Sequence, residues 1–268
     1  MRCLAIRWAI TLLQRHAAAT PTILCSIPTD MMSFGKRFGF ERLESRTVLN
    51  GTVFVTGALG ALTLQGDTSS NYLLIRQIGT TPGGGVNIRV QGLATTLDNV
   101  DTGTSGSVFT FTGVTTIASD LSQGGNDHLT LININISGQG DVGIGFGGGS
   151  DILTMTNVKA QNVAVSLGGG NDMASLVNIT AAAGGFALDA GAGRDTVVLN
   201  HVQSGTPGSG GGIAVEMGPG NRDVLTVVIC SADMAAFAET SGTNGVLVWK
   251  HTGNHFGAEA DAGFQIVV

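Results

Sequence analysis

The sequence of 268 residues is 43% hydrophobic but only 5% aromatic, and it carries a net charge of −6 at pH 7. The negative charge is concentrated in residues 114–268, whose net charge of −9 would repel nucleic acids and anionic membranes. No apolar run approaches the roughly 20 residues of a transmembrane helix, and the three cysteines define no disulfide framework. We therefore expect an elongated domain with an aliphatic core, no transmembrane segment and no nucleic-acid partner.

Residues 1–50 differ from the rest of the chain in carrying a net charge of +4. Residues 1–31 combine a basic start, an apolar run interrupted by Arg7 and three consecutive alanines, which is a weak signal-peptide pattern. We expect residues 1–50 to be a targeting or export segment, disordered or helical. We also expect residues 1–31 to be an upstream extension of the reading frame, with the working start at Met31 or Met32.

Residues 38–49 carry a short pattern, Phe-Gly-Phe-Glu-Arg-Leu-Glu-Ser-Arg-Thr-Val-Leu. It resembles the N-terminal Phe-Glu-x-Leu-Glu-x-Arg-x-Leu-Leu motif of secreted planctomycete proteins. Ser45 and Val48 depart from the commonest residues, and the matching positions are Phe40, Glu41, Leu43, Glu44, Arg46 and Leu49. The resemblance implies export and an extracellular or cell-surface location. A basic amphipathic helix at the start of a domain would be the alternative interpretation.

Residues 51–113 predict short strands separated by Gly, Asp-Thr and Pro-Gly turns. The expected strands are 52–56, 62–65, 72–78, 87–91 and 108–111. The stretch 66–73 resembles a degenerate copy of a turn that recurs later in the chain. We expect this part to form the first coils of a repeat structure and its N-terminal cap, since a terminal sheet edge needs covering.

A turn of glycines followed by an aspartate recurs through residues 114–230. The clearest copy is Gly168-Gly169-Gly170-Asn171-Asp172, and the aspartates are Asp127, Asp151, Asp172, Asp195 and Asp223. Successive aspartates are 24, 21, 23 and 28 residues apart, the last interval containing the glycine-rich insertion 205–212. A period of this length indicates a solenoid in which each repeat makes one coil.

The residues two and four places after each aspartate are apolar, which predicts a strand with one buried face. They are Leu129 and Leu131, Leu153 and Met155, Ala174 and Leu176, Val197 and Leu199, Leu225 and Val227. The pattern predicts an all-β, right-handed parallel β-helix (β-solenoid) with about 21–24 residues per coil and capped ends. We expect one domain over 51–268, with regular coils in 114–230 and a C-terminal coil and cap in 231–268, where the alanine-rich stretch 231–240 would be a helical turn or a distorted coil.

Asn133, Asn157 and Asn178 stand six places after successive aspartates. They share the parity of the apolar pairs, so we expect them to point inward and to form a hydrogen-bonded ladder at a second corner. The alternative is three separate turn asparagines, each bonding its own backbone.

The glycine–aspartate turns resemble the second half of the RTX-type repeat, Gly-Gly-x-Gly-x-Asp-x-apolar-x, whose stacked turns bind Ca²⁺. The resemblance makes Asp127, Asp151, Asp172, Asp195 and Asp223 candidate calcium ligands. The longer period and the lack of a second facing turn depart from that family, and Arg194 and Arg222 lie beside two of the aspartates. Alternatively, each aspartate bonds the backbone amides of its own turn. No other cofactor is expected.

Enzymatic activity is not expected, because no cluster of acids and bases is evident. We expect Asp189 and Asp141 to stack near each other, but no base or nucleophile accompanies them, and Lys159 is nearly alone on its face. His251 and His255 are spaced by four in a non-helical context, which is weak for a metal site.

Residues 114–223 also resemble the repeat regions of secreted planctomycete proteins, with runs such as Gly-x-Gly-Asn-Asp-Thr-Val-x-Leu-x-Asn-Val. We therefore expect a secreted or surface-held structural or adhesive rod without catalysis, whose partners would be extracellular polysaccharide or cell-envelope components. The alternatives are a polysaccharide-binding or -cleaving β-helix and a calcium-binding RTX-like protein.

Overall fold

A computed structural model describes residues 51–268, apart from 137, 139, 206–209, 221, 239–244, 251–253, 263 and 268. All of the described residues lie in one compact unit, Thr47–Val268. The export segment, its motif and His251 fall outside the described residues, so the expectations for them stay predictions. In the described residues no helix is long and apolar enough to cross a bilayer.

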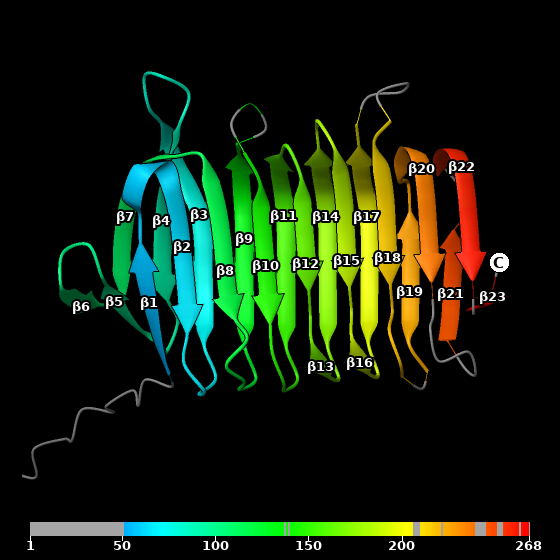
Figure 1. The fold of residues 1–268 in the computed structure, drawn as a ribbon, viewed down its shortest axis with the longest axis horizontal. Coiled ribbons are helices and arrows are strands. Elements are labelled where there is room, and N and C mark those ends of the chain that lie inside the picture. The colour runs from blue at the N-terminus through cyan, green and yellow to red at the C-terminus, as the bar shows by residue number, and fades with distance from the viewer. Residues whose placement is uncertain are drawn as a thin grey trace, which may run out of the picture. The chain divides into compact units, whose positions relative to one another are not determined.

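The first part of this unit contains antiparallel strands (Figure 1). Strand β1 pairs with β2, β3 with β4, β4 with β7, and β5 with β6. Their bounds are β1 Thr52–Thr56, β2 Ala61–Gly66, β3 Tyr72–Thr80, β4 Val86–Gly92, β5 Thr96–Asn99, β6 Thr104–Gly106 and β7 Val108–Val114. Strands β2 and β3 each also pair in parallel with a later strand, so they form the start of the coil stack.

Two series of parallel strands build the coils, which make a β-solenoid of about five turns. The first series stacks β3, β9 (His128–Asn135), β11 (Ile152–Ala160), β14 (Met173–Ala181), β17 (Thr196–Ser204), β19 (Val224–Val228), β21 (Gly245–Lys250) and β23 (Phe264–Val267). The second stacks β2, β8 (Thr116–Leu121), β10 (Val142–Phe146), β12 (Val163–Ser166), β15 (Gly185–Asp189), β18 (Gly212–Glu216), β20 (Ser231–Ala238) and β22 (His255–Ala262). The alanine-rich stretch is thus strand β20 and not a helical turn.

The core consists of apolar columns that run from coil to coil. Leu153 pairs in register with Leu129 and Ala174, and Met155 with Leu131 and Leu176. All ten apolar residues predicted to follow the aspartates are fully buried. The parallel β-solenoid and its inward columns are therefore confirmed, because side chains that alternate along each strand meet identical positions of the next coil.

The asparagine ladder exists, but it lies on the outer surface. Asn157 donates from Nδ2 to Oδ1 of Asn133 at 2.8 Å, and Asn178 donates to Asn157 at 2.9 Å. All three side chains are exposed, so the inward orientation was wrong. Their φ angles of 54°, 56° and 57° lie in the left-handed region. This conformation shifts the in–out alternation of side chains by one residue, so that the next residue, such as Val158, is buried instead.

At Gly170 the glycine turns stack so closely that a side chain does not fit. Short strands β13 (Gly169–Gly170) and β16 (Ala192–Gly193) pair in parallel at this corner. A Cβ on Gly170, whose φ is 146°, would overlap the carbonyl oxygen of Gly149 in the preceding coil. Glycine is therefore required here both by its backbone angle and by the approach of two main chains.

Candidate functional site

The five candidate aspartates form a single buried column. Each carboxylate Oδ1 accepts the backbone N–H of the residue at the same position one coil earlier. The donors are Asn71 to Asp127 (2.7 Å), Asp127 to Asp151 (2.7 Å), Asp151 to Asp172 (2.7 Å), Asp172 to Asp195 (2.9 Å) and Asp195 to Asp223 (2.7 Å). The aspartates thus bond the neighbouring coil and not, as one alternative held, the amides of their own turn.

The backbone shows why an aspartate is needed at this position. The carbonyl of Asp151 accepts the N–H of Met173, one residue after Asp172 in the next coil. The N–H of Asp151 donates instead to the carboxylate of Asp172 in the next coil. The side chain therefore replaces a main-chain acceptor at the place where the glycine turn leaves the parallel ladder, and it prevents a buried N–H from losing its partner.

The second carboxylate oxygen has no partner in several members of the column. Oδ2 of Asp127, Asp151, Asp172 and Asp223 is buried without a hydrogen bond. Burial raises the pKa of Asp127 and of Asp172 to about 6. The backbone N–H that each carboxylate accepts lowers the pKa, as does the Asn71 side chain for Asp127, and the neighbouring charge of Asp151 raises it. Burial also raises the pKa of Asp151. Asp127, Asp151 and Asp172 are therefore stacked acids that lose their protons less readily than ordinary aspartates.

The column does not bring several potential metal ligands together. Across the described part of the chain, no three His, Cys, Asp or Glu side chains lie close enough to hold one metal ion. Ca²⁺ takes six to eight oxygen ligands. In this geometry a calcium ion would depend on one Oδ2 from each of two coils together with backbone carbonyls.

Asp141 and Asp189, expected to stack near each other, lie at opposite ends of their strands within the second series. Asp141 precedes β10 and accepts hydrogen bonds from the backbone and side chain of Asn162. Asp189 ends β15, where it is in register with Ser166 and Glu216. Its Oδ1 accepts the N–H of Gly191 at 3.0 Å, a turn contact within its own coil.

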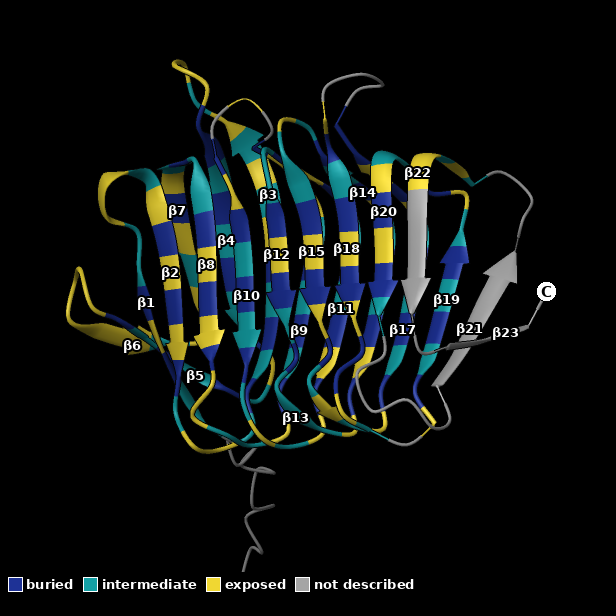
Figure 2. Cartoon of the chain, turned by 45° about the vertical axis from the view of Figure 1, so that its right-hand side comes forward, coloured by how far each residue is buried: buried dark blue, intermediate teal, exposed yellow. Residues whose placement is uncertain are grey.

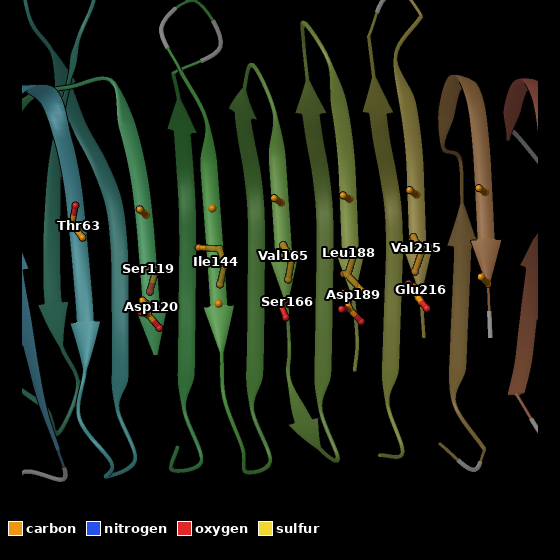
Figure 3. Close-up of a pocket in the computed structure, with 18 residues that line it drawn as sticks. Thr63, Ser119, Asp120, Ile144, Val165, Ser166, Leu188, Asp189, Val215 and Glu216 are labelled. Atoms are coloured by element: carbon orange, nitrogen blue, oxygen red, sulfur yellow. The ribbon is translucent and has the colours of Figure 1, made fainter. Parts of the chain in front are cut away.

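The outer face of the second strand series is flat and carries a row of small side chains. Ala118, Gly143, Ala164, Ala187, Ala214 and Ala236 follow one another in register from β8 to β20. They line a shallow groove of about 650 Å³, and the exposed bands of β12, β15 and β18 in Figure 2 belong to it. Ser166, Asp189 and Glu216 lie at equivalent places along one side of this groove (Figure 3).

A second, polar groove of about 490 Å³ lies outside the later halves of β11, β14 and β17. It is lined by Asn157, Lys159, Asn178, Thr180, His201 and Gln203. Lys159, Thr180 and Gln203 are in register and stand eight places after Asp151, Asp172 and Asp195. Lys159 is therefore not isolated on its face, as the sequence alone suggests, and the shared eight-residue spacing from the aspartates is the sequence signal that groups the three residues.

Comparison with known proteins identifies no relative: no protein-family model, curated protein or solved structure matches the chain.

Proposed function

We propose that this chain is a secreted or cell-surface structural or adhesive protein without catalytic activity. The observation that supports this best is the repetition of outward side chains from coil to coil, as in the register of Ala164, Ala187 and Ala214. Such columns give extended flat faces that a long polymer or an envelope layer can contact at many equivalent points. The motif of residues 38–49 supports the extracellular location.

The acids support a structural role more than a chemical one. The buried column is engaged in bonds between coils, and the exposed Asp120 and Asp189 each accept a backbone N–H two residues further along their own chain. Hydrolysis of a glycan needs two acids free to exchange protons across the bond. The calcium-stabilised alternative rests on the unpartnered Oδ2 atoms of the column.

Export can be tested by comparing two start positions of the chain. The chain starting at Met32 and the chain starting at Met1 would be expressed in a host that exports proteins with the N-terminal motif, and surface exposure measured by protease accessibility. We expect both chains outside the cytoplasm. Cytoplasmic retention of the shorter chain alone would make residues 1–31 a working signal, and retention of both would contradict the proposed location.

Adhesion would then be measured with the purified protein. Labelled protein should be retained on envelope fragments of the host, and it should release no reducing ends from a panel of polysaccharides. Release of reducing ends would replace the adhesive function by polysaccharide cleavage. Passage through the fragments without retention would contradict adhesion.

A further inference from the structure

The polar groove has the features of a binding site for a hydrogen-bonding polymer. It crosses three consecutive coils, and each coil contributes one residue from the left-handed corner and one from the position two further on. The corner residues are Asn157, Asn178 and His201. Strands β11, β14 and β17, which carry the groove, lie side by side in Figure 1.

The groove side chains retain unused donors and acceptors. In the described part of the chain, Lys159, Thr180 and Gln203 have no side-chain partner, and neither does the Oδ1 of Asn178. The amide ladder uses one N–H of Asn178 and leaves the other. The ring Nδ1 of His201 lies 2.6 Å from Asn200 Oδ1, which leaves its Nε2 for an outside group.

We propose that this groove binds a single uncharged polysaccharide strand lying along the coil stack. Coils repeat at about 4.8 Å, and an extended strand of equatorially linked pyranoses advances by a similar distance per sugar. Successive sugars would therefore meet equivalent pairs of side chains. The amides, the hydroxyl of Thr180, the ammonium of Lys159 and the imidazole of His201 complement sugar hydroxyl groups, which both donate and accept.

The charge of the protein selects an uncharged polymer over an acidic one. Among the described residues that line the groove, Lys159 alone is charged, whereas residues 114–268 have a net charge of −9. That field would oppose the approach of nucleic acids and acidic glycans alike. This inference rests on the proposed adhesive function, because it names the surface and the chemical class through which adhesion would occur.

The test measures retention on insoluble cellulose and chitin as uncharged probes and on immobilised alginate as the acidic probe. Two variants alter the groove: Asn178→Gly with Gln203→Ala, and Lys159→Met. Glycine keeps the left-handed backbone at position 178. Arg194→Met is the matched control, since it removes the same charge from an exposed residue at the glycine turn. Thermal unfolding of each variant checks that the fold is intact.

The wild-type protein should bind at least one uncharged probe, with little change at about 1 M salt, where charge effects are screened over about 3 Å. Each lost hydrogen bond should weaken binding by about threefold to tenfold, so the double variant should lose more than Lys159→Met. Arg194→Met should bind like the wild type. Preference for alginate that disappears in high salt would overturn the proposal, as would groove variants that bind normally.

Retention on envelope fragments separates the two proposals. If wild type and groove variants are retained equally on the fragments, adhesion stands and the groove is not its site. If the wild type is retained on neither fragments nor probes, the adhesive function itself fails.

Discussion

The backbone N–H of Asp151 donates a 2.7 Å hydrogen bond to Oδ1 of Asp172, which occupies the same position one coil later. The same bond recurs at every aspartate of the column. Each coil therefore depends on a side chain of its successor to satisfy a buried donor. This relationship explains why an acid follows the glycine turn without requiring that it bind a ligand.

The contribution of this bond can be isolated with two variants of Asp172. Both Asp172→Asn and Asp172→Ala remove the buried charge, but only asparagine keeps an oxygen for the N–H of Asp151. We expect Asp172→Ala to be less stable than Asp172→Asn by about 1–3 kcal/mol, the cost of an unsatisfied buried donor. Urea unfolding at one pH measures the difference. Equal unfolding free energies would mean that the bond contributes nothing.

Stability should fall as the pH rises from about 4 to about 6. Asp127 and Asp172 have pKa values raised from 3.8 to about 6 in the folded protein. Between these values the folded state binds more protons than the unfolded state, so the free energy of unfolding decreases with pH. Each unit of pKa difference corresponds to about 1.4 kcal/mol. The melting temperature should thus be higher near pH 4 than near pH 7, and Asp172→Asn should flatten the profile; a rising profile would contradict these pKa shifts.

Gly170 in the glycine turn should tolerate no side chain, whereas Gly143 in strand β10 should tolerate one. We expect Gly170→Ala to destabilise the protein by more than about 3 kcal/mol or to prevent folding, because its Cβ overlaps the Gly149 carbonyl. Gly143→Ala is the control, since nothing lies within 4 Å of its Cβ and alanines occupy the same place in neighbouring coils. It should be neutral or stabilising by about 0.5 kcal/mol. Similar melting temperatures for the two variants would contradict the close stacking.

Ile229 occupies the corner position that asparagine holds in earlier coils. Its φ of 52° is unfavourable for a β-branched side chain, and it is exposed. Ile229→Asn should therefore stabilise the protein by about 1 kcal/mol. Ile152→Asn, at an exposed isoleucine with no left-handed φ, should not stabilise it. Chemical denaturation of both variants tests the prediction, and a loss of stability in Ile229→Asn would refute it.

Calcium should change stability little. Oδ1 of every column aspartate already accepts a backbone bond, so few oxygens remain for an ion that prefers six to eight. We expect millimolar Ca²⁺ and chelator to give melting temperatures within about two degrees, on the scale where 1 kcal/mol shifts such a protein by about 2–4 degrees. A rise of about ten degrees, abolished by Asp151→Ala with Asp172→Ala, would instead show stabilising sites between coils.

The period, the apolar columns and the glycine corner could be predicted because each repeats in the sequence. The orientation of Asn157 could not, since period-two counting assumes an unbroken strand and its left-handed φ shifts the count by one. The donor to the Asp172 carboxylate was equally hidden, because an aspartate beside glycines fits a local turn as well as a bond to the neighbouring coil. The turn-like stretch 66–73 indicated an early coil, but the pairing of β3 with β9 joins residues 56 apart, an interval that departs from the 21–28 residues between successive aspartates.

The direction of the aspartate bonds has a consequence for how such a chain can lengthen. Each coil receives an acceptor from the coil that follows and supplies one to the coil that precedes. Duplicating residues 152–172 as a block would insert a complete donor and acceptor together, leaving no buried N–H unmatched at either junction. The molecule is in this sense modular, because whole coils can be gained or lost as units. An insertion of part of a coil is tolerated only outside the stacked strands, as in the glycine-rich segment before β18.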